Sequence, residues 1–144
     1  MSNTYLVACD GSPASERALN LAIKQASESG ASLLLAHVLE WSPYSFLTPE
    51  EIEERHKRRQ EELDRAQTSS IDPLIKTAAD AGVSATAVIR YGHVTETLAE
   101  IAEQEGVTQM FIGRTGDKAL AKLIFGSVAA GLAQIAPVPC TIVP

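Results

Sequence analysis

Long apolar runs are missing from this sequence of 144 residues, and positive charge is not in excess. A helix that crosses a membrane needs about 20 consecutive apolar residues, and no run approaches that length, so membrane insertion is not expected. The opening residues, MSNTYLVACDGS, lack the basic and apolar segments of a signal peptide. We therefore expect a cytoplasmic protein. The formal net charge of −6 argues against nucleic acids and anionic membranes as partners, because both attract basic surfaces.

Cysteine and histidine are scarce, and their spacing excludes several kinds of site. Cys9 and Cys140 lie in apolar, strand-like segments and form no C-x-x-C pair. We expect two buried free thiols, with a disulfide or redox pair as the alternative. His37, His56 and His93 have no metal-ligand spacing, so a zinc site is not expected; His37 is interpreted as a core or strand-end residue. The sequence also lacks a G-x-S-x-G elbow, which leaves ester hydrolysis without support.

Five short apolar runs alternate with segments of helical pattern. Hydrophobic residues make up 45% of the chain, enough for a buried core. Most of the runs are nearly continuous in apolar residues, which is typical of parallel strands covered on both faces. The runs are Tyr5–Cys9, Ser32–Leu39, Ala85–Arg90, Gln109–Gly113 and Cys140–Val143.

Helix signals lie between these runs. Ser12, Thr95 and Ser127 each precede residues with helical apolar spacing. The longest connection contains Thr48-Pro49, a helix start, followed by densely interleaved charges that predict a solvated face. Pro73 should kink or split this helix, with Asp72 as a candidate cap.

The resulting order, β-α-β-α-β-α-β-α-β, predicts an α/β fold with one five-stranded parallel sheet and helices on both faces, Rossmann-like, in a single domain over residues 1–144. Ligands of such folds bind outside the carboxyl ends of the strands, where the strand order reverses. That rule directs attention to Asp10, after the first run, and to Gly113, at the end of the fourth.

A glycine pattern begins at the end of the fourth run. It reads G-x2-G-x9-G-S, with glycines at 113, 116 and 126 before Ser127. Glycines permit positive φ and a close approach of the backbone to an anion. A helix that begins at Ser127 offers free amides and the positive end of its dipole, and Lys118 and Lys122 add positive charge within the spacer. The pattern predicts a phosphate cradle, although glycines alone would also suit ordinary turns.

Asp10 should lie beside this cradle. An acid at a strand-to-helix boundary often serves only as a turn or cap residue, but Ser12 is the better cap here, which leaves Asp10 for a ligand. His93, at the same end of the predicted sheet, is a weaker candidate for the pocket wall. The aromatic residues after the second run are interpreted as a cover over the sheet end, with a base-stacking platform as the alternative; they are Trp41, Tyr44 and Phe46.

These features together resemble the universal stress protein family over essentially the full length of the chain. The matching residues are Cys9-Asp10-Gly11-Ser12, His37-Val38, Gly92 and the pattern Gly113-x2-Gly116-x9-Gly126-Ser127-Val128. The last pattern marks the ATP-binding branch of the family. The resemblance implies the adenine nucleotide alpha hydrolase-like variant of the Rossmann architecture, with ATP, ADP or AMP as the ligand.

The resemblance also assigns roles around the nucleoside. Asp10 is implied to lie beside it, with Ala8 and Cys9 on the same wall. Val38 is implied to meet the adenine through its backbone. The residues implied to flank the ribose are Ile112 and Gly113.

The phosphates are implied to lie at the glycine pattern, with magnesium bridging their oxygens, since magnesium prefers oxygen ligands. The residues implied to hold them are Thr115, Gly116, Gly126, Ser127 and Val128, with Ala129 beside them. Some positions depart from the family's commoner pattern. Arg114 and Thr115 have exchanged residue types, Ala129 replaces a frequent Ser or Thr, and Thr108 stands where an acid often precedes the fourth strand. These departures bear on the affinity and on the number of phosphates bound.

The leading interpretation is an ATP-binding stress-response regulator whose nucleotide state changes a surface read by an unknown protein partner. A slow magnesium-dependent ATPase or phosphotransferase using Asp10 is the alternative, and a scaffold with an empty pocket is a third. A phosphorelay receiver is rejected, because Arg90-Tyr91-Gly92 supplies no phosphoacceptor aspartate. Cys140–Val143 should be an edge strand. Proteins resembling this chain commonly dimerise through that strand, so a homodimer is expected.

Overall fold

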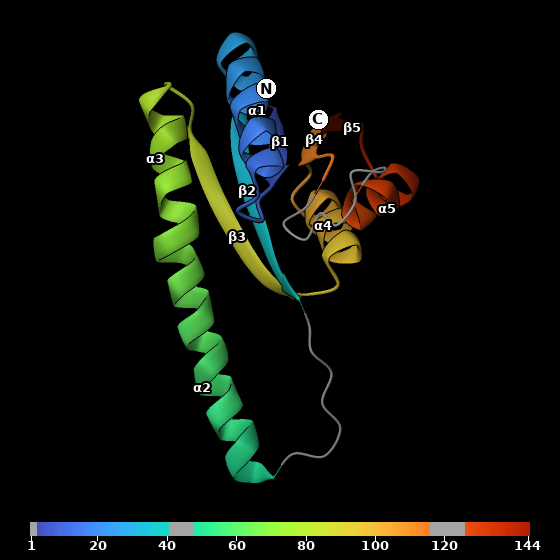
Figure 1. Cartoon of the computed structure of the whole chain (residues 1–144). Helices are drawn as coiled ribbons and strands as arrows, with labels where there is room; N and C mark the ends of the chain where they lie inside the picture. Colours follow the sequence, from blue (N-terminus) through green and yellow to red (C-terminus); the bar gives the residue numbers. More distant parts are fainter. Residues whose placement is uncertain (1–2, 41–47, 116–125) are drawn as a thin grey trace.

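The computed structural model describes residues 3–40, 48–115 and 126–144. Strands and helices alternate along these ranges, as the sequence predicts (Figure 1). The elements are β1 (Thr4–Ala8), α1 (Pro13–Ser29), β2 (Ser32–Glu40), α2 (Pro49–Arg65), the π-helix η1 (Ala66–Ile71), α3 (Asp72–Asp80), β3 (Ala85–Gly92), α4 (Val94–Gln104), β4 (Gln109–Gly113), α5 (Ser127–Ile135) and β5 (Cys140–Val143).

The five strands form one parallel sheet in the order β3-β2-β1-β4-β5. This confirms the predicted α/β fold. From β1 the chain adds β2 and β3 on one side, and β4 then returns to the other side of β1. The strand order therefore reverses between β1 and β4, which is where ligands of such folds bind. Strand β5 lies at an edge of the sheet, as predicted.

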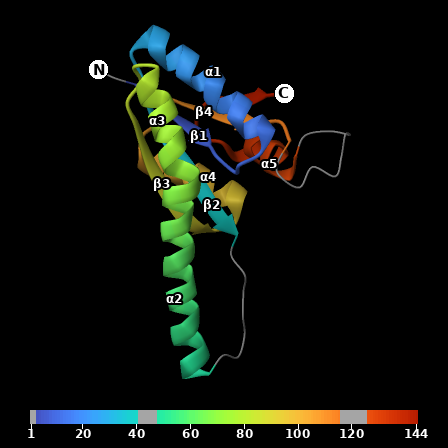
Figure 2. The ribbon, with the colours of Figure 1, turned by 60° about the vertical axis from the view of Figure 1, so that its left-hand side comes forward.

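Helices cover both faces of the sheet (Figures 1 and 2). Side chains alternate along β1, so that Leu6 and Ala8 join the core under α4 and α5, whereas Tyr5 and Val7 join the core with α1 and α3. Leu6 and Val7 are fully buried. Each such side chain contributes about 1.5–3 kcal/mol on burial, and this fixes the register that aligns the strand ends.

In the crossover from β2 to β3, a π-helical turn stands where a kink or split of the helix was expected. Helices α2 and α3 are joined by η1, in which the Asp72 N–H donates to the Gln67 carbonyl, five residues back. Pro73 lacks an N–H and its ring crowds the preceding turn, and a π-type turn accommodates such a disruption without ending the helix. The expectation that Asp72 caps a new helix is wrong, because Ile71 holds the cap position and the backbone stays helical through it.

Helix α2 extends beyond the carboxyl ends of β2 and β3 (Figures 1 and 2). Every one of its seventeen residues is described, and none of their side chains is buried, which confirms the predicted solvated face. Tyr91, on β3, contacts its C-terminal half: the hydroxyl donates to Glu62 over 2.5 Å, and the Arg59 guanidinium lies 5.2 Å from the ring centroid. Partial burial and the bond to Glu62 raise the pKa of Tyr91 to about 12.

Both cysteines are free thiols, but only Cys9 is buried. Cys140 lies on the edge strand β5 and is partly exposed, so the expectation of two buried thiols is wrong for this residue. In the ranges 3–40, 48–115 and 126–144, no helix is both long enough and apolar enough to cross a membrane.

Candidate functional site

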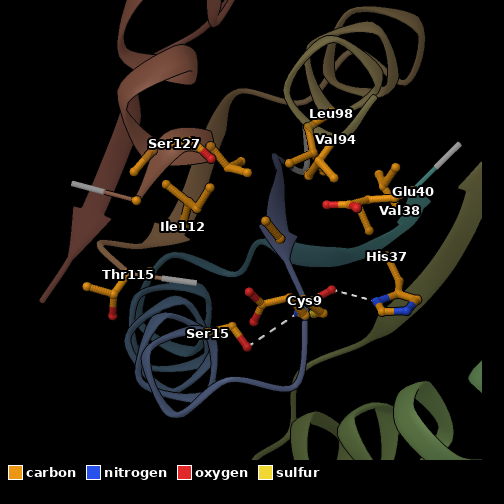
Figure 3. Close-up of a pocket in the computed structure, with 17 residues that line it drawn as sticks. Cys9, Ser15, His37, Val38, Glu40, Val94, Leu98, Ile112, Thr115 and Ser127 are labelled. Carbon is orange, nitrogen blue, oxygen red and sulfur yellow. Dashed lines mark hydrogen bonds between the residues drawn. The ribbon is translucent and has the colours of Figure 1, made fainter. Parts of the chain in front are cut away.

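A cavity of about 330 Å³ opens at the carboxyl ends of β1, β2 and β4, beside the reversal of strand order (Figure 3). A volume of this size is within the range of small-molecule sites. Eleven of the twelve residues predicted to bind a ligand line the cavity, and the twelfth, Gly116, lies outside the described residues. The eleven are Ala8, Cys9, Asp10, Val38, Ile112, Gly113, Thr115, Gly126, Ser127, Val128 and Ala129.

The floor of the cavity is apolar because strand alternation places small and branched side chains on one face. Ala36 and Val38 on β2 and Ile112 on β4 belong to the core cluster under α4 and α5. Val94 and Leu98, from the first turns of α4, form the opposite wall (Figure 3). The space between them suits a flat apolar group.

Strand β2 extends beyond the end of β1 at this end of the sheet. The pairing of the two strands stops at Ala8 and Ala36, whereas β2 continues to Glu40. The Cys9 N–H donates to the Ala36 carbonyl on the β1 side over 2.8 Å, whereas the Leu33 N–H donates toward β3. Successive residues of a strand point their peptide groups to opposite sides. The N–H and C=O of Val38 therefore face the β1 side, where β1 has ended and the cavity begins.

The turn after β1 is held by its own side chains. Ser12 caps α1, as predicted, and its hydroxyl accepts from the Ser15 N–H over 3.1 Å. Asp10 Oδ1 accepts from the Ser12 N–H over 2.9 Å, forming an Asx-type turn. Asp10 thus lines the cavity and also serves as a turn residue, so it is not left solely for a ligand, contrary to expectation.

The N-terminus of α5 is different. Its cap residue is Gly126, which has no side chain to accept from the first-turn amides. The first amides of an α-helix lack intrahelical acceptors, and those of Ser127, Val128 and Ala129 belong to residues that line the cavity. The Gly126 N–H donates to the Arg114 carbonyl over 2.6 Å, which places this helix end beside the end of β4.

Neither Gly113 nor Gly126 uses a positive φ, and Gly113 instead allows a close approach of the backbone. Gly126 has φ −56°, a value open to any residue. A Cβ on Gly113 would lie 2.7 Å from the carbonyl carbon of Ala14 and 2.9 Å from its oxygen. Gly113 therefore lets β4 pack directly against the first turn of α1. The expected use of positive φ at these two positions is wrong.

The sequence profile of the Universal stress protein family matches residues 1–144. The chain belongs to this family. Universal stress protein YxiE of Bacillus subtilis is 28% identical over 156 aligned residues, which cover 99% of this chain and 99% of YxiE. The solved structure of Universal stress protein UspA from Lactobacillus plantarum matches with a TM-score of 0.85 at 22% identity, covering 99% of this chain and 97% of that one.

Two further universal stress proteins with this fold were solved with an adenine nucleotide. The protein from Archaeoglobus fulgidus, in complex with dAMP, has a TM-score of 0.67 at 17% identity and covers 100% of this chain and 98% of its own. A family protein from Arabidopsis thaliana, with AMP bound, has a TM-score of 0.65 at 16% identity and covers 98% and 90%. At these identities the likeness shows the shared fold.

The cavity of this universal stress protein also includes residues that the sequence reasoning did not assign. Ala36 and Glu40 share the strand face of Val38, so period-two alternation was a usable signal. Val94 and Leu98 depend on how α4 packs, which no local pattern specifies. Among the described residues, the additional lining residues are Ser15, Ala36, His37, Glu40, Val94 and Leu98.

His37 and Cys9 form the side of the cavity next to β2. The His37 Nδ1 lies 2.7 Å from the Cys9 carbonyl oxygen, so this nitrogen carries the proton and donates (Figure 3). His37 lies within β2, paired with Ile89 on β3 and partly buried, and it also lines the cavity. Burial, with a smaller effect from Asp10, raises the pKa of the Cys9 thiol to about 12. The Cys9 side chain packs in the core with α1 and α3, where its thiol is a buried, uncharged group.

Other candidates fall away from the cavity or outside the described residues. His93 precedes α4 at its cap position and makes no side-chain cap bond in the part of the chain that the structure describes. It is exposed and is not among the lining residues described. The candidates outside the described residues are Trp41, Tyr44, Phe46, Lys118 and Lys122.

Proposed function

We propose that this universal stress protein is an ATP-binding stress-response regulator of the family's ATP-binding branch, formed by residues 1–144 as one nucleotide-binding domain. The observation that carries the proposal is the cavity in which the Val38 peptide edge, the Asp10 turn and the N-terminus of α5 meet, where no described side chain caps the helix. The dAMP and AMP bound by the Archaeoglobus and Arabidopsis proteins support an adenine nucleotide as the ligand class.

The chemistry of the wall fits a nucleotide in three parts. Adenine presents an adjacent hydrogen-bond acceptor and donor on one edge, which match the N–H and C=O of Val38, and its faces suit the apolar walls at Ile112 and Val94. The ribose would lie toward Asp10 and Gly113. The phosphates would lie at the first turn of α5, because free amides and the helix dipole favour an anion there.

Magnesium would be held by phosphate oxygens in this proposal. Within the described residues, no group of three or more His, Cys, Asp and Glu side chains is placed to hold a metal ion. Magnesium commonly keeps several waters and binds through substrate phosphates, so a dedicated protein cage is not required. When bound, the ion would neutralise phosphate charge in an acidic protein.

Regulation would follow from a population shift. A ligand changes the equilibrium between two conformations by its difference in affinity for them. Occupancy at Ser127 and Gly126 would bear on Arg114, whose carbonyl accepts from Gly126 and whose N–H donates to Val143 over 2.7 Å. The nucleotide state could thereby reach β5, the edge through which we propose that the protein forms a homodimer, and a surface read by a protein partner.

The test is to identify the nucleotide that co-purifies with the native protein by mass spectrometry, and then to titrate AMP, ADP and ATP with and without magnesium. Gly126→Leu should remove binding, because it places a side chain over the first-turn amides in a φ region that leucine tolerates. Ala133→Leu, on the exposed side of the same helix, is the matched control. Full nucleotide content in the Gly126→Leu protein would count against the site.

A slow magnesium-dependent ATPase or phosphotransferase remains the second candidate function, favoured by the position of Asp10 in the cavity wall. The bond from the Ser12 N–H occupies one oxygen of this carboxylate, which weakens Asp10 as a general base. Turnover of radiolabelled ATP above about 1 per second would favour the enzyme. Slower turnover with stoichiometric binding would favour the regulator.

A further inference from the structure

Glu40 is the acidic residue of the cavity that neither the motif pattern nor the fold rule points to. It is the last residue of β2 and lies one pleat beyond Val38 on the same face of the strand. Its register partner on β3 is Gly92, which has no side chain, so the β3 side does not crowd it at this level. Figure 3 shows its carboxylate directed into the cavity, beneath Val94 and Leu98.

Two hydrogen-bond acceptors therefore lie next to each other along the β2 side of the cavity. The carbonyl of Val38 faces the cavity because β1 has ended, and the carboxylate of Glu40 comes next. An ionised carboxylate only accepts hydrogen bonds. Adjacent acceptors are matched by an –NH₂ group, whose two hydrogens can each satisfy one of them. A carbonyl oxygen placed there would face two acceptors with no proton between them.

The geometry points to Glu40 as the residue that selects the base, by accepting the second hydrogen of the exocyclic amino group of adenine. This inference rests on the proposed function, because it assumes that the base lies against Val38. One N6 hydrogen goes to the Val38 carbonyl and the other to the Glu40 carboxylate, while the Val38 N–H donates to N1 of the ring. Bases with an oxo group in place of the amino group are disfavoured at both acceptors.

The charge of Glu40 has an opposite effect that the test must separate. A carboxylate near a nucleotide repels its phosphates, so removing it strengthens the binding of every nucleotide alike. Base selection, in contrast, appears only in the ratio of affinities for ligands that share ribose and phosphate. N6-methyl-AMP is the matched probe, because it keeps one N6 hydrogen for Val38 and loses the one assigned to Glu40.

The experiment is calorimetric titration of AMP, N6-methyl-AMP and dAMP into the wild-type protein, Glu40→Ala and Glu40→Gln. We expect the wild type to bind AMP about tenfold more tightly than N6-methyl-AMP, since a hydrogen bond to a charged acceptor is lost. Glu40→Ala should bind the two ligands equally, and Glu40→Gln should lie between. Glu96→Gln, an exposed acid in the first turn of α4 and outside the described lining residues, should keep the wild-type ratio.

The outcomes separate the role proposed for Glu40 from the proposed nucleotide-binding function. If the wild type binds AMP and Glu40→Ala keeps the tenfold ratio, the base-selection role is overturned while the proposed function stands. If Glu40→Ala instead erases a preference for AMP over dAMP, the carboxylate holds the ribose and the assignment is also overturned. If the wild type binds no adenine nucleotide, the proposed function itself fails. Circular dichroism of each variant confirms that the fold is retained.

Discussion

Single residues determine how closely this site is packed, and Gly113 is a position that leaves no room for a side chain. The end of β4 packs against the backbone of Ala14, so even one methyl group has no room. The neighbouring residues cannot move aside easily, because the obstacle is a peptide group and not the tip of a flexible side chain. Gly113 therefore couples the position of the cavity floor to the stability of the fold.

Gly113→Ala should destabilise the protein by about 1–3 kcal/mol, the usual range for overpacking. Urea denaturation followed by circular dichroism measures the change. Adding Ala14→Gly should restore only part of the loss, because it removes the contact with the Ala14 Cβ but leaves the contacts at 2.7 and 2.9 Å with its carbonyl carbon and oxygen. A fully stable Gly113→Ala protein would show that the strand and helix can separate here.

Cys9 gives the protein a dependence on alkaline pH. Its folded-state pKa is raised to about 12 from an ordinary value of 9.0. The thiol therefore stays protonated in the folded state while the unfolded chain loses the proton, so stability is complete below pH 9 and falls as pH rises toward 12. By pH 10.5 the loss from this residue is about 2 kcal/mol.

The measurement compares the wild type with Cys9→Ala by urea denaturation between pH 8 and pH 10.5. The stability advantage of the wild type over Cys9→Ala should shrink by about 2 kcal/mol over this interval. Cys140→Ala is the control: burial also raises the pKa of Cys140, but this residue is only partly buried, and its effect should be smaller. A difference between wild type and Cys9→Ala that is constant with pH would contradict the assigned cause.

At the scale of elements, α1 and α2 have the same length and the same kind of cap, but different surroundings. Each spans 17 residues and begins after a hydroxyl residue, Ser12 or Thr48, whose oxygen accepts a first-turn amide. Helix α1 buries seven residues against the sheet, whereas all of the described α2 side chains are at least partly exposed. Capping energy should therefore reach the whole fold through α1 and remain local in α2.

Thr48→Ala and Ser12→Ala form a matched pair. Losing either cap should cost about 1 kcal/mol. In Ser12→Ala the loss should appear in the global free energy of unfolding. In Thr48→Ala it should appear as roughly fivefold faster amide exchange in the first turns of α2, with global unfolding unchanged. Equal global losses in the two variants would mean that α2 is tied to the core more firmly than its exposure indicates.

The strands were the most predictable elements, and side-chain packing was the least. Apolar runs and their spacing located all five strands, and Gln109–Gly113 was placed to the residue. The fold rule then led to Asp10 and Gly113 without any knowledge of packing. The wall from Val94 and Leu98 depends on the approach of α4 to the sheet, and η1 depends on how Pro73 is accommodated. Both are decided by three-dimensional packing, which a linear pattern does not encode.

At the scale of the whole molecule, the edge strand β5 decides whether a second copy can join the sheet. The Pro139 carbonyl accepts from Met110 on β4, and the Val143 carbonyl accepts from Arg114, the residue that follows β4. Alternation therefore turns the peptide groups of Thr141 toward β4 and those of Cys140 and Ile142 outward. The proposed homodimer would use this outward edge, and the two kinds of position give variants with opposite expectations.

Ile142→Pro should give a folded monomer, because it removes an outward N–H and proline is tolerated on the open side of an edge strand. Some stability is lost with the packing of Ile142. Thr141→Pro removes a donor that faces β4 and should destabilise the monomer itself. Analytical ultracentrifugation measures the mass, and denaturation measures the fold. A dimer of unchanged affinity in Ile142→Pro would exclude this edge as the interface.

The unequal lengths of β1 and β2 have a consequence for the design of synthetic ligands. On the proposed function, a planar ring that presents an acceptor to the Val38 N–H and an amino group to its carbonyl would fit beside this edge of β2, even without a sugar or a phosphate. Uncharged heterocycles of this kind are therefore a rational starting point for inhibitors. Such compounds would occupy the apolar part of the cavity without bringing a negative charge to a protein whose formal net charge is −6.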